Sequence, residues 1–168
     1  MGKVLNLEDL RAEREDLRRR GKTFVFTNGC FDIIHRGHVE ILKSARGLGD
    51  VLAVGVNSDD SMRRLKGPRR PIVSEDDRAA VVAALACVDF VTIFEDDTPE
   101  RIIKALVPDV LVKGSDYELP EIVGRETVES AGGKVARLEL FGDYSTESML
   151  RRIAEIYGDG GVEGSSQG

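Results

Sequence analysis

The only two histidines of the chain, His35 and His38, lie three residues apart in one segment, TNGCFDIIHRGHVEIL. At this spacing on the first turn of a helix, both rings point to the same side. Gly37, between them, removes a side chain that would keep a ligand away from the backbone. The preceding Asn28-Gly29 turn frees amide groups, and a helix N-terminus presents unpaired N–H groups with a partial positive charge. The segment therefore predicts a phosphate site at which two imidazoles donate hydrogen bonds.

Three other interpretations of this segment stay open. The histidines could be ordinary surface residues of a helix, without a ligand. They could bind zinc, for which Cys30 is the nearest candidate for a third ligand. Cys30 could also be a nucleophile activated by His35, although nothing nearby supplies the group that would orient the imidazole.

A second group of charged residues follows the second expected strand. Lys66, Arg69 and Arg70 lie in the loop KGPRRP, and Arg78 comes soon after them. In an acidic protein, such a concentration of cations suits a loop that closes over a triphosphate. A solvated basic loop without a ligand is the alternative.

Two further segments follow later strands. Lys113-Gly114 ends the fourth expected strand, and its glycine lets a flat base lie against the backbone. Ser145 and Thr146 open the last expected helix, where hydroxyls and free amides suit an anion. An ordinary strand-to-helix turn and an ordinary N-cap explain these residues equally well.

Apolar runs and helical patterns alternate along the chain, and the expected N-caps of three helices are Ser74, Thr98 and either Ser145 or Thr146. The expected strands are residues 23–28, 51–57, 90–94, 110–114 and 134–140. The expected helices are residues 5–20, 34–48, 59–65, 74–86, 98–106, 121–131 and 145–157.

Five strands that alternate with helices predict an α/β fold, a doubly wound five-stranded parallel sheet with both faces covered. In such a sheet the ligand crevice lies beyond the carboxyl ends of the strands, where all four segments described above fall. We expect one domain over residues 1–157. The tail over residues 158–168, GDGGVEGSSQG, has no apolar anchor and is expected to be disordered.

Composition argues against several classes of protein. The 168 residues carry 24 Lys+Arg and 30 Asp+Glu, and a net charge of −6 does not suit a general nucleic-acid binder. Two cysteines, Cys30 and Cys87, cannot form a disulfide framework and fit reduced thiols. No apolar run approaches the ~20 residues that span a bilayer, and the charged N-terminus does not fit a signal peptide. We expect a cytoplasmic protein that binds neither nucleic acid nor membranes.

The run Asn-Gly-Cys-Phe-Asp over residues 28–32, followed by His35-Arg-Gly-His38, resembles the nucleotide-binding signature of the cytidylyltransferase-like nucleotidyltransferases. Cys30 stands where many members have Thr or Ser. The family's fold is a doubly wound parallel sheet. Its reaction transfers a nucleoside monophosphate from ATP or CTP to a phosphorylated acceptor, with release of pyrophosphate. The resemblance implies Mg²⁺ bound together with ATP, and no metal site built by the protein itself.

The resemblance also implies roles for individual residues. The residues implied in catalysis, as donors or cations facing the phosphates, are His35, His38, Lys66 and Arg78. The residues implied in nucleotide binding are Thr27, Asn28, Gly29, Cys30, Phe31, Gly37, Lys113, Gly114, Asp116, Ser145 and Thr146. Asp32 would contact the acceptor, and Arg69 and Arg70 are weaker candidates for phosphate contacts.

Longer similarity favours the branch of the family that transfers AMP to heptose 1-phosphate. The pattern Lys-Gly-Ser-Asp-Tyr over residues 113–117 resembles that branch, and Leu140-Phe141-Gly142 lacks the Arg-Thr that the cytidylyl branch usually carries. In many bacteria this domain follows a sugar kinase in one chain; here we expect it to stand alone, as a homodimer.

Two kinds of alternative stay open. Within the family these are a glycerol-3-phosphate cytidylyltransferase and an FAD-synthetase-like enzyme. From a different class comes a nucleotide- or redox-sensing binding protein, with Cys30 as the sensor.

Overall fold

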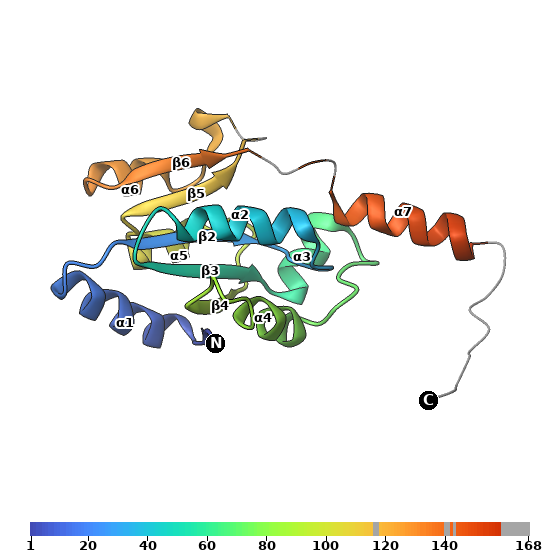
Figure 1. Cartoon of the computed structure of the whole chain (residues 1–168), viewed down its shortest axis with the longest axis horizontal. Coiled ribbons are helices and arrows are strands. Elements are labelled where there is room, and N and C mark those ends of the chain that lie inside the picture. The colour runs from blue at the N-terminus through green and yellow to red at the C-terminus, as the bar shows by residue number, and fades with distance from the viewer. Residues whose placement is uncertain (116–117, 140–141, 143, 159–168) are drawn as a thin grey trace.

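The computed structural model describes residues 1–115, 118–139, 142 and 144–158, and its strands form a parallel sheet with helices on both faces (Figure 1). Its elements are β1 (Lys3–Val4), α1 (Leu7–Arg19), β2 (Phe24–Gly29), α2 (Arg36–Arg46), β3 (Val51–Asn57), α3 (Asp59–Lys66), α4 (Glu75–Ala83), β4 (Phe90–Phe94), α5 (Glu100–Leu106), β5 (Val110–Gly114), the 3-10 helix η1 (Leu119–Glu121), α6 (Arg125–Ser130), β6 (Lys134–Leu138) and α7 (Thr146–Tyr157).

The sheet has six strands, whereas the sequence predicts five. The strand order is β1-β4-β3-β2-β5-β6, and each neighbouring pair is parallel. The additional strand, β1, has only two residues, too few for any alternation that a sequence pattern could show. Backbone hydrogen bonds from Lys3 N to Asp89 O (3.0 Å) and from Leu5 N to Val91 O (2.9 Å) hold it at the edge of β4.

The order of the strands reverses between β2 and β5. From β2 the chain first builds the side with β3 and β4, and it then returns to add β5 and β6 on the other side. The carboxyl ends of two neighbouring strands diverge at such a switch point and leave a crevice for a ligand. The strands point toward the side of the molecule where α3 and the start of α7 lie (Figure 1).

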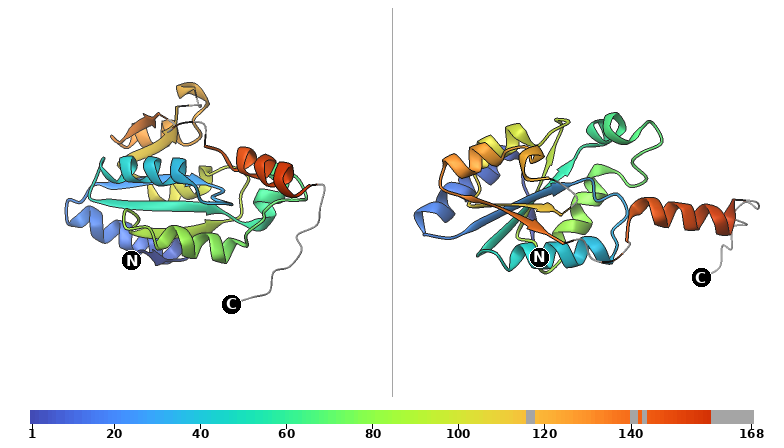
Figure 2. Two further views of the ribbon diagram at one scale, coloured as in Figure 1. Left: turned by 45° about the vertical axis from the view of Figure 1, so that its right-hand side comes forward. Right: turned by 90° about the horizontal axis from the view of Figure 1, so that it is seen from above.

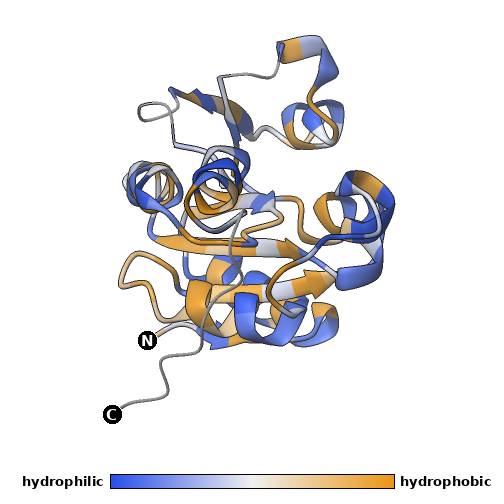
Figure 3. Ribbon diagram, turned by 90° about the vertical axis from the view of Figure 1, so that its right-hand side faces the viewer, coloured by the Kyte–Doolittle hydropathy of each residue, from blue (hydrophilic) through white to orange (hydrophobic). Residues whose placement is uncertain are grey.

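Two apolar layers cover the sheet, one on each face. In β2, Val25 packs into a cluster with residues of α2 and α4, whereas Phe24 and Phe26 pack into a cluster with residues of α1, α5 and α6. Seen from above, these two groups of helices lie on opposite sides of the strands (Figure 2). The strands between them are coloured as apolar (Figure 3). Both layers are buried, as a doubly wound sheet requires.

A buried arginine anchors α1 to the sheet. The side chain of Arg14 is 2% exposed, and its guanidinium donates to Leu106 O (3.3 Å), to Val107 O (3.0 Å) and to the carboxylate of Asp109 (2.8 Å). The other carboxylate oxygen of Asp109 accepts a hydrogen bond from Phe24 N (2.7 Å). One carboxylate therefore joins α1 to β2 and to the segment before β5.

Two of the three expected N-caps are confirmed. Ser74 accepts a hydrogen bond from Asp77 N at the start of α4, and Ser145 forms a capping box at the start of α7. The third is wrong, because Pro99 takes the N-cap position of α5 and Thr98 precedes it. A proline can take this place because a helix start leaves its first N–H groups unpaired in any case.

The second half of the chain differs from the predicted elements in one helix. The helix expected over residues 121–131 begins only at Arg125, after a separate 3-10 turn, because Gly124 has a left-handed backbone (φ 87°) that interrupts it. From residue 159 on, the tail expected to be disordered lies outside the described residues. Among the helices of the described part, none is long and apolar enough to cross a membrane.

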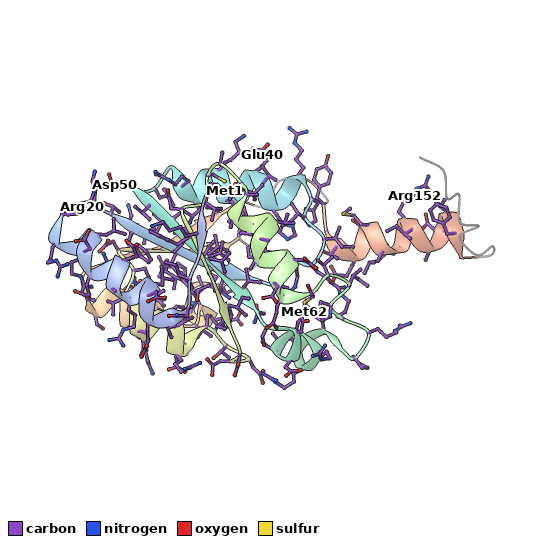
Figure 4. The ribbon with its side chains drawn as sticks, turned by 90° about the horizontal axis from the view of Figure 1, so that it is seen from below. Met1, Arg20, Glu40, Asp50, Met62 and Arg152 are labelled. Carbon is purple, nitrogen blue, oxygen red and sulfur yellow. The ribbon has the colours of Figure 1, made fainter. Side chains whose placement is uncertain are left out.

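Helix α7 projects beyond the carboxyl edge of the sheet. In two views its outer part, marked by Arg152, stands away from the remaining elements (Figure 2 and Figure 4). Of its residues, only Thr146 is buried. The helix therefore contributes to the body of the protein mainly through its first turn.

Candidate active site

A cavity of about 610 Å³ opens at the carboxyl ends of β2, β3 and β5 and extends to the start of α7. It lies at the switch point of the sheet, where a ligand is expected. The predicted site residues that line it are Thr27, Asn28, Gly29, Cys30, Phe31, Asp32, His35, Gly37, His38, Lys66, Lys113, Gly114, Ser145 and Thr146. Arg78 does not line it, and Asp116 lies outside the described residues.

The two imidazoles stack on each other. The ring centroids of His35 and His38 are 3.8 Å apart at an interplanar angle of 26°, and the ring of Phe31 lies 5.2 Å from that of His38. Both Nδ1 atoms are buried, and neither has a hydrogen-bond partner among the described residues. A buried polar atom without a partner costs free energy, and the stacked rings carry this cost in the wall of the cavity.

Both histidines are neutral at physiological pH. Burial and, to a smaller extent, the neighbouring His35 lower the pKa of His38 from 6.5 to about 4. Burial also lowers the pKa of His35, against the opposing charge of Glu147. Each imidazole therefore carries one N–H and acts as a hydrogen-bond donor without a net charge.

Lowering the pH should decrease the free energy of unfolding through protonation of His38. Its pKa in the folded state, about 4, lies below the ordinary value of 6.5, so the unfolded chain binds a proton first as pH falls. The free energy of unfolding should therefore decrease from pH 6.5 down to pH 4, by on the order of 1–2 kcal/mol at pH 5 from this group. Urea unfolding at pH 7 and pH 5 measures it. The variant His38→Gln should lose less stability between these pH values than the unmodified chain, and an equal loss would contradict the prediction.

Two glycines let the turn after β2 fold tightly around the rings. A Cβ at Gly29 would lie 3.1 Å from the ring of Phe31, and a Cβ at Gly37 would lie 3.1 Å from the ring of His35. Phe31 itself has a positive φ of 49°, which is uncommon for a residue with a side chain. The spacing of glycines and aromatic residues in this segment thus serves the close packing of the site.

Asp32 was expected to contact the acceptor, but in the structure it binds the basic loop. Its carboxylate is buried and accepts hydrogen bonds from Arg70 Nε (2.7 Å), Ile72 N (2.8 Å) and Val73 N (2.9 Å). These contacts fasten the end of the loop to the turn that carries the histidines. Arg70, a weaker candidate on sequence grounds, lines the cavity.

Arg78 was expected to hold a phosphate, and the structure places it elsewhere. Its side chain is fully buried beneath the cavity. The guanidinium donates to Val73 O (2.9 Å), to Cys30 O (2.5 Å) and to the carboxylate of Asp59 (2.8 Å). Because all of these donors are engaged by the protein, Arg78 positions the β2–α2 turn and does not face a ligand.

The two predicted lysines stand at different ends of the cavity. Lys66 is exposed at the end of α3. Lys113 is almost fully buried at the end of β5, and its Nζ donates to Oδ1 of Asn28 across the switch point. The cavity thus has an exposed cation at one end and, at the other, a buried cation that is hydrogen-bonded to Asn28.

Neither the zinc nor the thiol interpretation finds support in the geometry. In the described residues, no three His, Cys, Asp or Glu side chains gather where they could hold a metal ion. The Sγ of Cys30 lies 3.9 Å from Oδ1 of Asn57, and burial raises the pKa of the thiol, which keeps it protonated.

A second cavity, of about 470 Å³, does not suit a phosphate. Its wall is largely acidic, and its arginine, Arg64, is already paired with Asp97 (2.6 Å). The residues that line it are Ser58, Asp60, Arg64, Glu75, Glu95, Asp96 and Asp97.

Several residues of the first cavity were not expected from the sequence. They come from α2 and α3, from the segments at the ends of β3 and β4, from the end of η1 and the segment after it, and from the start of α7. These residues are Ile41, Asn57, Leu65, Asp97, Thr98, Pro99, Glu121, Ile122, Val123, Tyr144 and Glu147. Only their position after a strand, which is where ligands bind in this type of sheet, could have indicated them.

The sequence matches the family described as Cytidylyltransferase-like over residues 26–138. This span begins in β2 and ends with β6, and it includes the histidine pair and both lysines. The chain belongs to the cytidylyltransferase-like family. The family indicated by the His-x-Gly-His segment is thereby confirmed, and the chain is a nucleotidyltransferase by membership.

Curated relatives of this cytidylyltransferase-like chain are longer than the chain itself. Bifunctional protein HldE of Syntrophotalea carbinolica is 52% identical over 158 residues, which are 94% of this chain and 32% of the relative. Bifunctional protein HldE of Citrifermentans bemidjiense is 48% identical over 155 residues, 92% of this chain and 32% of the relative. The chain thus spans about a third of the length of these relatives.

Solved structures share the cytidylyltransferase-like fold. The lipopolysaccharide core biosynthesis protein from Thermoplasma volcanium has a TM-score of 0.60 and 30% identity, over 74% of this chain and 100% of that chain. The pantoate-beta-alanine ligase from Francisella tularensis has a TM-score of 0.57 at 12% identity, over 83% of this chain and 67% of that chain. The second likeness concerns the fold alone.

Proposed function

We propose that the chain transfers AMP from ATP to heptose 1-phosphate, forming ADP-heptose and pyrophosphate. The observation that carries this proposal is the stacked histidine pair, whose Nδ1 atoms have no partner in the described part of the chain and which lies between two unlike halves of one cavity. Each half suits one substrate.

The half of the cavity toward β5 suits the nucleotide base. Gly114, Ile122 and Val123 line it, and a glycine with two apolar side chains accommodates a flat ring. The half toward α3 lies on the other side of β2, and its cations are Lys66 and Arg70, whereas Lys113, the cation on the β5 side, donates to Oδ1 of Asn28. Cations suit phosphate groups. ATP and a sugar phosphate would therefore meet at the histidines.

In this arrangement an oxygen of the sugar phosphate attacks the α-phosphorus of ATP in line. A new P–O bond forms, the bond between the α-phosphorus and the oxygen bridging to the β-phosphate breaks, and pyrophosphate leaves with that electron pair. The attacking oxygen is already an anion, so no general base is required. His35 and His38 donate hydrogen bonds to the transferred and leaving phosphates, and Lys66 neutralises their charge.

We propose Mg²⁺ as the counter-ion of ATP. In the described residues, the chain builds no cluster of acidic and imidazole ligands for it, so the ion would be held chiefly by the nucleotide phosphates. The residues of the chain act on the phosphates directly.

The choice of heptose 1-phosphate rests on sequence and on relatives. The Lys-Gly-Ser-Asp-Tyr pattern favours the heptose branch over the cytidylyl branch, and the Thermoplasma volcanium structure is named for lipopolysaccharide core biosynthesis. A homodimer and a cytoplasmic location stay predictions.

Release of pyrophosphate tests the proposal. ATP and CTP are each combined with heptose 1-phosphate, as both anomers, and with glycerol 3-phosphate, in the presence of Mg²⁺. We expect release only from ATP with the heptose. Release of pyrophosphate from CTP with glycerol 3-phosphate would show that both proposed substrates are wrong. If no combination releases pyrophosphate while ATP still binds, the chain is better described as a nucleotide-binding protein without turnover.

Cys30→Ser separates an enzyme from a redox sensor. The thiol is protonated, and no described contact joins it to His35, so the enzyme should keep its turnover within about threefold. A sensor would instead bind ATP and lose its response to an oxidant in this variant. Pyrophosphate release before and after treatment with hydrogen peroxide measures both. Loss of turnover in untreated Cys30→Ser would contradict the mechanism given above.

A further inference from the structure

Arg70 is a largely buried cation in the loop between α3 and α4. Its side chain is 13% exposed, and it lines the cavity. The carboxylate of Asp32, itself almost fully buried, accepts a hydrogen bond from Arg70 Nε and holds the guanidinium in place. Within the part of the chain that the structure describes, no hydrogen bond is made by Nη1 or Nη2 of Arg70.

The Nη1 side of this guanidinium faces a second carboxylate, that of Glu147. The distance from Arg70 Nη1 to Glu147 Oε1 is 3.8 Å, which is too long for a hydrogen bond. The side chain of Glu147 is 58% exposed on the first turn of α7, and an ion pair with so exposed a partner contributes little stability. A stronger anion can therefore displace Glu147 from Arg70.

Glu147 also lies close to the histidine pair. Its charge acts on the imidazole of His35. A group that takes the place of the carboxylate therefore meets Arg70 on one side and the donors of the reaction on the other. A phosphate suits this place, because the fork of a guanidinium donates two parallel hydrogen bonds to it.

We propose that Arg70 binds the phosphate of the acceptor, and that Glu147 is a placeholder which this phosphate displaces. The acceptor phosphate is favoured over the phosphates of ATP because Arg70 lies in the half of the cavity opposite to Gly114 and the apolar wall that suits the base. The inference rests on the proposed function for the identity of the acceptor. It predicts opposite effects of removing the two charges.

Isothermal titration calorimetry tests the inference without turnover. Heptose 1-phosphate is titrated into the full chain with Mg²⁺ and saturating α,β-methylene-ATP, whose α,β bridge cannot be cleaved, and the analogue is titrated separately. The variants are Arg70→Gln and Glu147→Gln. Arg63→Gln is the matched control, because Arg63 is an exposed arginine of α3 that pairs with Asp60 and does not line the cavity.

Arg70→Gln should weaken the binding of heptose 1-phosphate roughly 10- to 100-fold, as expected for the loss of charge-assisted hydrogen bonds. Glu147→Gln should tighten it roughly two- to fivefold, because a competing charge is removed. Binding of the ATP analogue should change less than about twofold in either variant and in the control. If Arg70→Gln does not fold, the affinity of Glu147→Gln for heptose 1-phosphate still tests the inference. Glu147 is exposed, so this variant is expected to fold.

Other outcomes separate the two proposals. Weaker binding of the ATP analogue to Arg70→Gln, or unchanged acceptor binding in both variants, overturns the role of Arg70 while the proposed function stands. Acceptor binding that depends on Arg70, without any pyrophosphate release by the unmodified chain, overturns the proposed function and supports the inference. No binding of heptose 1-phosphate or glycerol 3-phosphate by the unmodified chain overturns both.

Discussion

His38→Ala is expected to lower the turnover number about 100-fold or more while the protein stays folded. The imidazole of His38 is neutral and stacked on His35, and its Nδ1 has no partner in the described residues. In the proposed mechanism, its removal deletes a hydrogen-bond donor to the phosphates in the wall of the cavity. In the part of the chain that the structure describes, the ring of His38 makes stacking contacts and its Nδ1 makes no hydrogen bond, so the fold should tolerate the change.

The rate of pyrophosphate release at saturating substrates and the thermal unfolding midpoint together measure this effect. Lys43→Ala is the matched control, because Lys43 lies on the same helix, is 58% exposed and pairs with Glu40, and it does not line the cavity in the described part of the chain. The control should keep its activity and its midpoint. Full activity of folded His38→Ala would mean that the histidines serve packing rather than transfer.

Arg78→Lys should cost on the order of 3 kcal/mol of folding free energy, although the charge is kept. The guanidinium of Arg78 reaches Val73 O, Cys30 O and Asp59 at once, and a lysine ammonium cannot span all of them. At least one of the acceptors that Arg78 now satisfies, Val73 O, Cys30 O or the Asp59 carboxylate, then lacks a hydrogen-bond donor. Urea unfolding measures the loss.

Arg101→Lys provides the control for this prediction. Arg101 pairs with Asp96 at the surface, where the exchange should change stability by less than about 0.5 kcal/mol. If Arg78 held a phosphate, the lysine variant would keep most of its stability and show a raised KM for ATP instead. Unchanged stability with a raised KM would thus restore the role expected from the sequence.

The histidine site was predictable because its information is local. His35, Gly37 and His38 lie on one helical turn, so the spacing alone decides that they share a side. The strands were predictable for the same reason, since burial on both faces produces continuous apolar runs such as VLAVGVN over residues 51–57. For these elements a local sequence pattern was sufficient, whereas the exact start of a helix was not, as Thr98 and the helix expected over residues 121–131 show.

The partners of Asp32 and Arg78 were not predictable, because they come from distant parts of the chain. Asp32 is paired with a residue 38 positions away, and Arg78 with the carbonyl of a residue 48 positions away. Residue type shows that such charges need a partner, but not whether the partner is the protein or a ligand. In both cases the protein supplies it. The two-residue strand β1 was likewise invisible, because backbone contacts alone define it.

The anchoring of α1 by Arg14 has a consequence for the order in which the chain assembles. The hydrogen bonds of its guanidinium join residues 92 to 95 positions apart in sequence. Such contacts can form only after the entropic cost of closing a long loop has been met. We therefore expect α1 to dock late in folding, once the segment between α5 and β5 is in place, and to complete that apolar layer rather than nucleate it.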